Sequence, residues 1–167
     1  MKIVIAAFVL IFFIGCQENE AVKDDFTGNE VVYSLQSGSI YPISGTATFK
    51  EKKDGSTIIN IELTGTEGNI EHPVHLHLGE ISSPGAEVAA LLNPVKGSTG
   101  KSETTFTMLA DETPLKYSQL IELNACIKIH LAASGPDRDI ILATGNIGSA
   151  DGARIAGGNE IGICKSE

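Results

Sequence analysis

The sequence predicts an all-β fold, an antiparallel Greek-key-like β-sandwich with one short helix. Three observations predict it. Segments of strand length alternate apolar and polar residues, turns rich in Gly, Pro and Asp separate them, and only one segment carries helix start signals. The chain has 167 residues, which suits a single domain, and we expect that domain to span residues 31–148.

Residues 1–15 have the pattern of a signal peptide. Lys2 gives a positive start, and residues 3–14 form an unbroken apolar run that is too short to span a bilayer. The run ends at Gly15-Cys16, and a polar string follows directly. The protein is therefore expected to be exported.

The Gly-Cys junction resembles a bacterial lipoprotein signal, in which Cys16 is lipidated and becomes the new N-terminus. Phe13 departs from that pattern, and the alternative is an ordinary cleaved signal peptide with an incidental cysteine. With lipidation, residues 16–30 form a flexible tether to the membrane of the bacterial cell envelope. Gln17 directly after the lipidated residue favours the outer membrane, by resemblance to lipoprotein sorting rules.

The charge of the chain argues against nucleic acid as a partner. The formal net charge is −9, and removal of residues 1–15, which hold one lysine and no acid, makes it −10. Such a surface repels phosphate backbones and anionic head groups. Attachment to a membrane would therefore depend on the lipid.

The domain reads as a series of short strands. In order, they are residues 31–35, 44–52, 56–64, 72–79, 88–92, 103–108, 125–132 and 139–147. Ile59 and Ile61 illustrate the alternation, since Asn60 and Glu62 face the other way. Asp54-Gly55 predicts a tight hairpin between the second and third strands.

The one expected helix begins near Thr113. Thr113 is a plausible N-cap, and Pro114 suits the first helical position. Leu115, Leu120 and Ile121 could supply an inward stripe, and the helix ends near residue 123.

Two cysteines remain if Cys16 carries lipid. Cys126 and Cys164 then form the single pair in an oxidising setting, and we expect a disulfide that docks the Gly-rich tail, residues 149–167. The alternative is two unrelated thiols, with Cys126 buried in a strand.

The candidate site is a group of histidines. His75 and His77 share one face of a strand, and His130 lies opposite the aliphatic residues of a late strand. If these strands are neighbours, three imidazoles converge into a site that suits copper or zinc. His72 is a weaker candidate because it lies an odd number of residues from His75 and should point to the other face. Cys126 could add a soft ligand unless it is in a disulfide. The alternative is that these histidines bond backbone groups and close one end of the sandwich.

Three segments resemble the CHRD domain, named after chordin: residues 74–79 with His75-Leu76-His77, residues 126–131 with Ile129-His130, and residues 143–148. The similarity in order and spacing covers about residues 41–148. The resemblance implies an all-β sandwich in an extracytoplasmic module whose biochemical role is mostly undefined.

The His75-x-His77 strand also resembles the copper-binding strand of copper/zinc superoxide dismutases. That family uses six histidines and one aspartate, whereas this chain has four histidines and none between Leu78 and Ile129. The bridging histidine is therefore missing, which argues against dismutase activity. The sequence also has no Gly-x-Ser-x-Gly elbow, phosphate-binding glycine loop or His-Glu-x-x-His motif.

The sequence thus predicts a non-enzymatic binding or structural lipoprotein of the cell envelope, working through a protein or matrix partner. The alternative is an envelope protein that binds copper or zinc through His75, His77 and His130.

Overall fold

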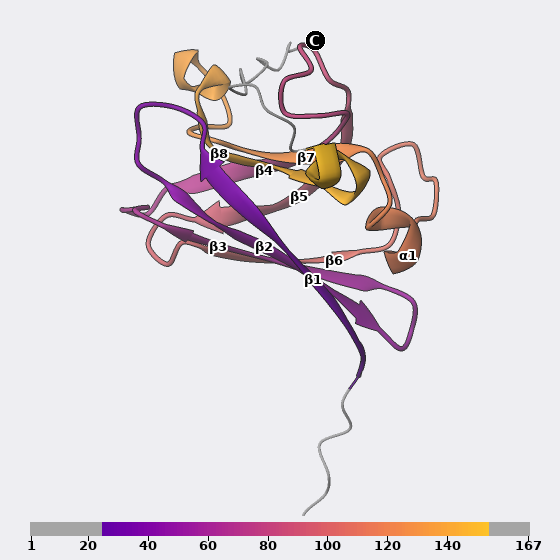
Figure 1. Cartoon of the computed structure of the whole chain (residues 1–167). Coiled ribbons are helices and arrows are strands. Elements are labelled where there is room, and N and C mark those ends of the chain that lie inside the picture. Colours follow the sequence, from indigo (N-terminus) through magenta and orange to yellow (C-terminus); the bar gives the residue numbers. More distant parts are fainter. Residues whose placement is uncertain (1–24, 154–167) are drawn as a thin grey trace, which may run out of the picture.

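The structure is a computed structural model that describes residues 25–153. Within them, eight antiparallel strands close into a barrel (Figure 1). The strands are β1 (Phe26–Ser37), β2 (Ser44–Lys52), β3 (Thr57–Thr64), β4 (Glu71–Leu78), β5 (Val88–Lys96), β6 (Lys101–Phe106), β7 (Ala125–His130) and β8 (Ile141–Ile147). The described helices are α1 (Tyr117–Leu120) and the 3₁₀ helices η1 (Pro136–Asp139) and η2 (Gly148–Ala153).

The strand order around the barrel is β1-β2-β3-β6-β5-β4-β7-β8. Strands β4, β5 and β6 follow one another as hairpins, and β3 lies beside β6 while β7 lies beside β4. The connection from β3 to β4 and the connection from β6 to β7 each pass over two intervening strands, as in a Greek key. The connection from β6 to β7 matters for the site, because it brings the late strand β7 next to the histidine-rich strand β4.

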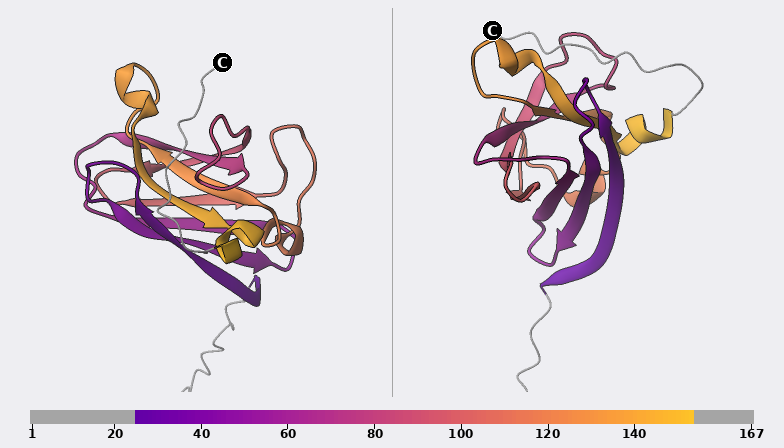
Figure 2. Two further views of the ribbon diagram at one scale, coloured as in Figure 1. Left: turned by 45° about the horizontal axis from the view of Figure 1, so that its top comes forward. Right: turned by 90° about the vertical axis from the view of Figure 1, so that its left-hand side faces the viewer.

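The expected sandwich is wrong, although the all-β class is correct. In Figure 1, β1, β2, β3 and β6 lie on one side and β4, β5, β7 and β8 on the other, but the two sides are joined at both seams. The long curved strand β1 pairs with β8 through Gln36↔Thr144 and Ser37↔Ala143 (Figure 2). Strands β5 and β6 pair through Lys96↔Lys101. Alternating strands suit a sandwich and a barrel equally, and these few pairs decide between them.

The barrel interior is filled by the apolar residues that alternate along each strand. Fully buried examples are Phe49 from β2, Ile59 from β3, Leu76 from β4 and Ile127 from β7. The rings of Tyr33 and Phe49 meet edge to face, with centroids 5.2 Å apart. The interior of the barrel is therefore a packed core, and the candidate site has to lie outside it.

The first strand begins earlier than the sequence suggested. Strand β1 starts at Phe26, so residues 26–30, expected in the tether, belong to the barrel. The side chains of Thr27 and Asn29 both donate hydrogen bonds to a carboxylate oxygen of Glu51, at 2.9 and 2.7 Å. The expected signal peptide and the lipidation site Cys16 lie outside the described residues, as does Cys164.

The helix was predicted too early and too long. Helix α1 spans only Tyr117–Leu120, whereas Pro114 forms a β-bridge with Met108. The carbonyl of Thr113 accepts a hydrogen bond from the backbone N–H of Leu109, which holds this segment in a tight loop before the helix. Thr113 and Pro114, which were expected to begin the helix, thus lie in a turn that precedes it. Among the described residues, no helix is both long and apolar enough to cross a membrane.

Candidate metal centre

The site lies on the outer face of the barrel, where β4 and β7 pair. The register places His75 opposite Lys128 and His77 opposite Cys126. Leu76 belongs to the core, so alternation turns His75 and His77 outward. His130 follows Lys128 by two residues and shares its face. All three predicted ligands therefore lie on the same outer face, as their alternation along the strands led us to expect.

The three imidazoles converge. One ligand nitrogen each from His75, His77 and His130 lies within 4.8 Å of the others. The ring centroids of His75 and His130 are 4.5 Å apart, and those of His75 and His77 are 5.7 Å apart. Two nitrogens bound to one metal at about 2.0–2.1 Å are roughly 3.3 Å apart in a tetrahedral site and about 4 Å apart when opposite. Small ring movements would therefore bring these nitrogens to metal-binding distances.

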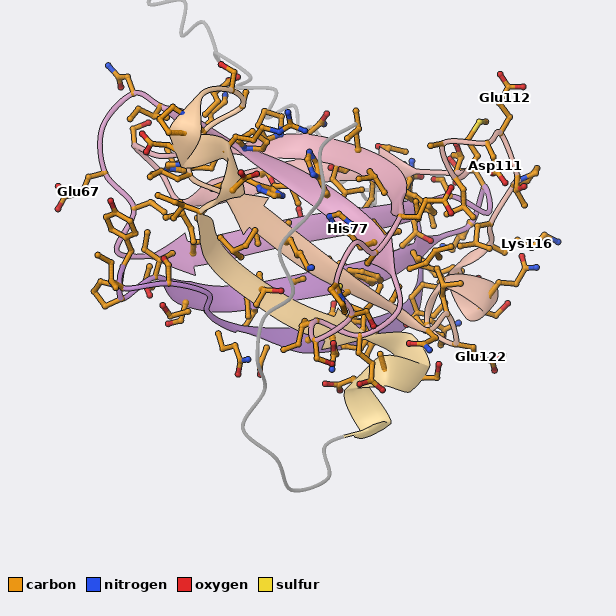
Figure 3. All side chains as sticks on the ribbon, turned by 90° about the horizontal axis from the view of Figure 1, so that it is seen from above. Glu67, His77, Asp111, Glu112, Lys116 and Glu122 are labelled. Atoms are coloured by element: carbon orange, nitrogen blue, oxygen red, sulfur yellow. The ribbon has the colours of Figure 1, made fainter. Side chains whose placement is uncertain are left out.

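The outer face is covered, which the sequence did not reveal. His77 is 0% exposed and His130 is 3% exposed. Figure 3 shows His77 near the middle of the molecule, whereas Asp111 and Glu112 lie at its rim. The loop after β4 contributes to this cover, because the backbone N–H of its buried residue Ile81 donates a hydrogen bond to Asn146 on β8. That loop therefore reaches across β7.

Backbone carbonyls fix the rings of two histidines. Nδ1 of His77 lies 2.9 Å from the carbonyl oxygen of Ala86, and Nδ1 of His130 lies 2.8 Å from that of Arg138. A carbonyl oxygen only accepts, so each Nδ1 carries the proton and donates it. In this tautomer Nε2 holds the lone pair that a metal would use. Such outer hydrogen bonds are typical of metal-ligating histidines.

His75 differs from the other two. Its Nδ1 is buried and has no hydrogen-bond partner among the described residues. Burial, aided by the charges of the neighbouring histidines and Arg138, lowers the pKa of His75 to about 4. The ring is therefore neutral at pH 7, and its buried nitrogen is a polar atom that a metal would satisfy.

The other two rings are also held neutral. Desolvation by burial lowers the pKa of His77 and of His130, and the charge of Lys128 adds to the effect at both. The carbonyls of Ala86 and Arg138 oppose these shifts, since they favour the protonated rings. Metal binding requires neutral imidazole, so the environment prepares all three rings for it.

A shallow depression gives access to the cluster from the side of His75. It has a volume of about 240 Å³. Its lining is mostly apolar and consists of Glu71, Pro73, Val74, His75, Leu91, Leu92, Pro94 and Ala133. Of the three imidazoles, only that of His75 reaches this depression, so an ion would enter past it.

Two other candidate ligands lie apart from the cluster. Nδ1 of His72 donates to the carbonyl oxygen of Leu131 at 3.1 Å, and His72 is not among the converging ligands. Cys126 is buried and pairs in register with His77, but its sulfur is not among them either. The expected disulfide partner Cys164 lies outside the described residues, so the pairing stays a prediction.

Sequence reasoning did not identify Lys128 as a buried neighbour of the histidine cluster. This lysine is 0% exposed and stands opposite His75 on the outer face. Its position two residues before His130 placed it on the histidine face, so the alternation of the strand carried the signal. Nothing in the local pattern indicated that this face is covered.

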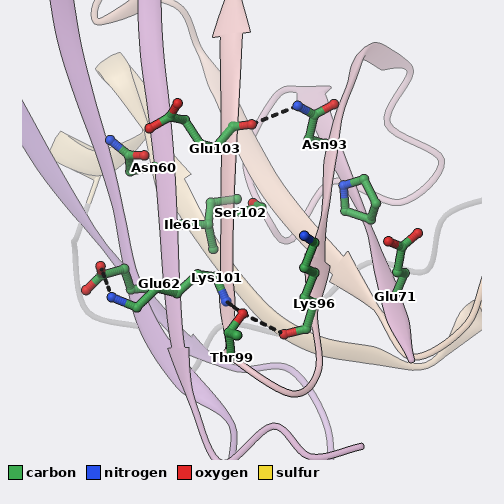
Figure 4. Close-up of a pocket in the computed structure, with 11 residues that line it drawn as sticks. Asn60, Ile61, Glu62, Glu71, Asn93, Lys96, Thr99, Lys101, Ser102 and Glu103 are labelled. Carbon is green, nitrogen blue, oxygen red and sulfur yellow. Dashed lines mark hydrogen bonds and ion pairs between the residues drawn. The ribbon is translucent and has the colours of Figure 1, made fainter. Parts of the chain in front are cut away.

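A larger hollow of about 640 Å³ lies at the seam between β5 and β6 (Figure 4). Most residues that line it are polar or charged, and an ion pair of 2.7 Å between Lys101 and Glu62 lies on its wall. The side chain of Asn93 crosses the seam to the carbonyl of Glu103. None of the three clustered histidines lines this hollow, so size alone does not identify the site.

Comparison with known proteins adds no assignment: neither a protein-family model nor a curated protein matches this chain.

Proposed function

We propose that this protein binds a copper or zinc ion through His75, His77 and His130 at the bacterial cell envelope, and that it acts as a binding protein rather than an enzyme. The observation that carries the proposal is the convergence of three ligand nitrogens within 4.8 Å of one another. Imidazole nitrogen suits both metals.

The donor set supports this function over a merely structural one. Histidines that only close one end of a barrel need backbone partners, and His77 and His130 have them through Nδ1. The Nδ1 atom of His75 is buried without such a partner among the described residues. An ion held by Nδ1 of His75 and Nε2 of the other two would satisfy all three rings.

Location and attachment complete the proposal. A lipid on Cys16 would hold the protein on the envelope, with the outer membrane favoured by Gln17, and the barrel would be a CHRD-like module. The chain would then sequester an ion at the envelope or deliver it to a protein partner. The leader sequence supports attachment through a lipid. The test is metabolic labelling with a fatty acid: the wild-type protein should take up the label, and Cys16→Ala should not.

The test of metal binding uses the full chain purified in detergent. We expect one equivalent of Cu or Zn by elemental analysis after equilibration and removal of unbound ion. The double variant His75→Ala/His77→Ala should lose it, and His130→Ala should weaken binding as much as His77→Ala does. In the wild type, ion at about 100 times the dissociation constant should stabilise the fold by about 2.7 kcal/mol.

His72→Gln is the matched control. His72 is a buried histidine of the same strand, but it bonds Leu131 and lies outside the cluster. This variant should keep the full equivalent of metal. A wild-type chain that retains no ion, and whose stability ignores added metal, would contradict the proposal and leave the histidines with a structural role.

A further inference from the structure

Lys128 is the charged residue closest in register to the candidate metal centre. It is completely buried on the outer face of β7, opposite His75 on β4 and Thr144 on β8. Lysine is rarely buried to this degree, because removing an ammonium from water is costly. Its position on the face of the imidazoles makes its charge relevant to any ion bound there.

The charge of Lys128 acts on the centre. It contributes to the lowered pKa of both His77 and His130, after the larger effect of burial. Arg138 adds a second positive influence at His75 and His130, and Asp139 opposes it at His130. Lys128 lies opposite His75 in register and two residues before His130 on the same strand, so its ammonium should repel a metal cation bound among the three rings.

The three converging ligands carry no charge that would offset this repulsion. All three ligands are imidazoles, which are neutral when they bind a metal. The depression beside His75 is mostly apolar, with Glu71 as the acidic residue in its lining, so it offers little solvation to a doubly charged ion. An ion that enters therefore bears an electrostatic cost that grows with its own charge.

We propose that Lys128 determines the ion preference of this centre, by disfavouring Zn²⁺ and Cu²⁺ relative to Cu⁺. This inference rests on the proposed function and refines it. The repulsion energy is proportional to the product of the two charges, so it is twice as large for a dication as for Cu⁺ at the same position. Lys128 is a specificity-determining residue here and is not itself a ligand.

The test compares affinities for Cu⁺ and Zn²⁺ in the full chain and in Lys128→Leu, by competition with chromophoric chelators. Leucine removes the charge and adds no atom that binds a metal ion. We expect affinity for Zn²⁺ to rise about tenfold and affinity for Cu⁺ about threefold, because the factor for a dication is the square of that for a monocation. Work near pH 7.5, above the lowered pKa of the rings, removes proton competition.

The readout is the ratio of the two affinities, because partial unfolding would lower both by the same factor. Lys128→Gln provides a second neutral variant and should show the same change in ratio. Lys128→Arg keeps the charge and should keep the wild-type ratio. Equal factors for both ions, or no change for either, would overturn the role of Lys128 while leaving metal binding intact. A wild-type chain that binds neither ion would instead contradict the proposed function.

Discussion

The backbone N–H of Ile81 donates a hydrogen bond of 2.8 Å to Oδ1 of Asn146, and this bond ties the loop after β4 to β8. The same loop carries Ala86, whose carbonyl oxygen accepts from Nδ1 of His77. Asn146 thus acts on the candidate centre through the loop, without contributing a ligand.

Asn146→Ala should therefore weaken metal binding while leaving all three ligands in place. Without the anchor the loop holds the carbonyl of Ala86 less firmly, and the ring of His77 loses its fixed orientation. Loss of such an outer contact typically lowers metal affinity about 10–100-fold. Competition titration with a chelator measures the change.

Asn93→Ala is the control for this prediction. Asn93 also bridges two segments through its side chain amide, but it does so at the β5–β6 seam. Its loss should lower stability by about 1 kcal/mol and leave metal affinity unchanged. If both variants bound metal as the wild type does, the loop would have no part in holding His77.

The metal-free protein should lose stability as the pH falls from about 6.5. An unfolded chain protonates its histidines near 6.5, whereas the folded chain holds the pKa of His75 at about 4 and those of His77 and His130 below the ordinary value. Between these values the unfolded state binds more protons, so the free energy of unfolding decreases with falling pH. The free energy of unfolding is therefore highest above about pH 6.5, where histidines are neutral in both states, and it falls as the pH drops from 6.5 towards the lowered pKa values of the folded chain.

Urea denaturation from pH 7.5 to 4.5 checks this dependence. His75→Gln is the comparison, because glutamine does not titrate and carboxylates contribute equally to both proteins. The variant should show a shallower loss of stability between about pH 6.5 and pH 4.5. Parallel curves for the two proteins would show that burial does not hold His75 neutral.

The local chemistry of the site follows from the sequence, and its assembly does not. Alternation along a strand is enough to place His75 with His77, and His130 with Lys128. Their convergence depends on β4 lying beside β7, which is a Greek-key crossover between segments about fifty residues apart. A single sequence carries no signal that these two strands are neighbours, so it predicts the cluster only on the condition that they are.

Burial of the outer face was hidden for a similar reason. The strand Ala125–His130 alternates like a half-exposed strand, yet all its residues are buried. The cover comes in part from a loop whose sequence, with Ser82-Ser83-Pro84-Gly85, is typical of an exposed turn. Its position depends on the long-range bond from Ile81 to Asn146, which no local pattern predicts.

Leu76→Ala should separate stability from metal binding. Leu76 is fully buried in the core and lies between His75 and His77 along β4. Removing its branched end should lower the free energy of unfolding by about 2–5 kcal/mol. Thermal melts should show that saturating metal raises the melting temperature of this variant and of the wild type, but not that of His75→Ala/His77→Ala. A variant that melts as the wild type does would contradict the placement of Leu76 in the core.

Gly145→Ala should open the seam that closes the barrel. A Cβ atom at Gly145 on β8 would lie 2.3 Å from the carbonyl oxygen of Ser34 on β1 and 3.0 Å from Cδ2 of Leu35. The backbone of β1 cannot yield this space without moving away from β8, where the two strands share few pairs. Overpacking of this kind costs about 1–3 kcal/mol or more.

Hydrogen exchange locates the effect of this substitution. The amide of Gly38, which donates to the carbonyl of Leu142 across the seam, should exchange faster in Gly145→Ala. Gly55→Ala is the control, because Gly55 has a φ of +88° but a Cβ atom there would meet no atom within 4 Å. It should cost about 1 kcal/mol through backbone strain and leave protection at Gly38 higher than in Gly145→Ala. Equal protection of Gly38 in Gly145→Ala and in the wild type would mean that β1 and β8 are not packed closely enough at Gly145 for a methyl group to separate them.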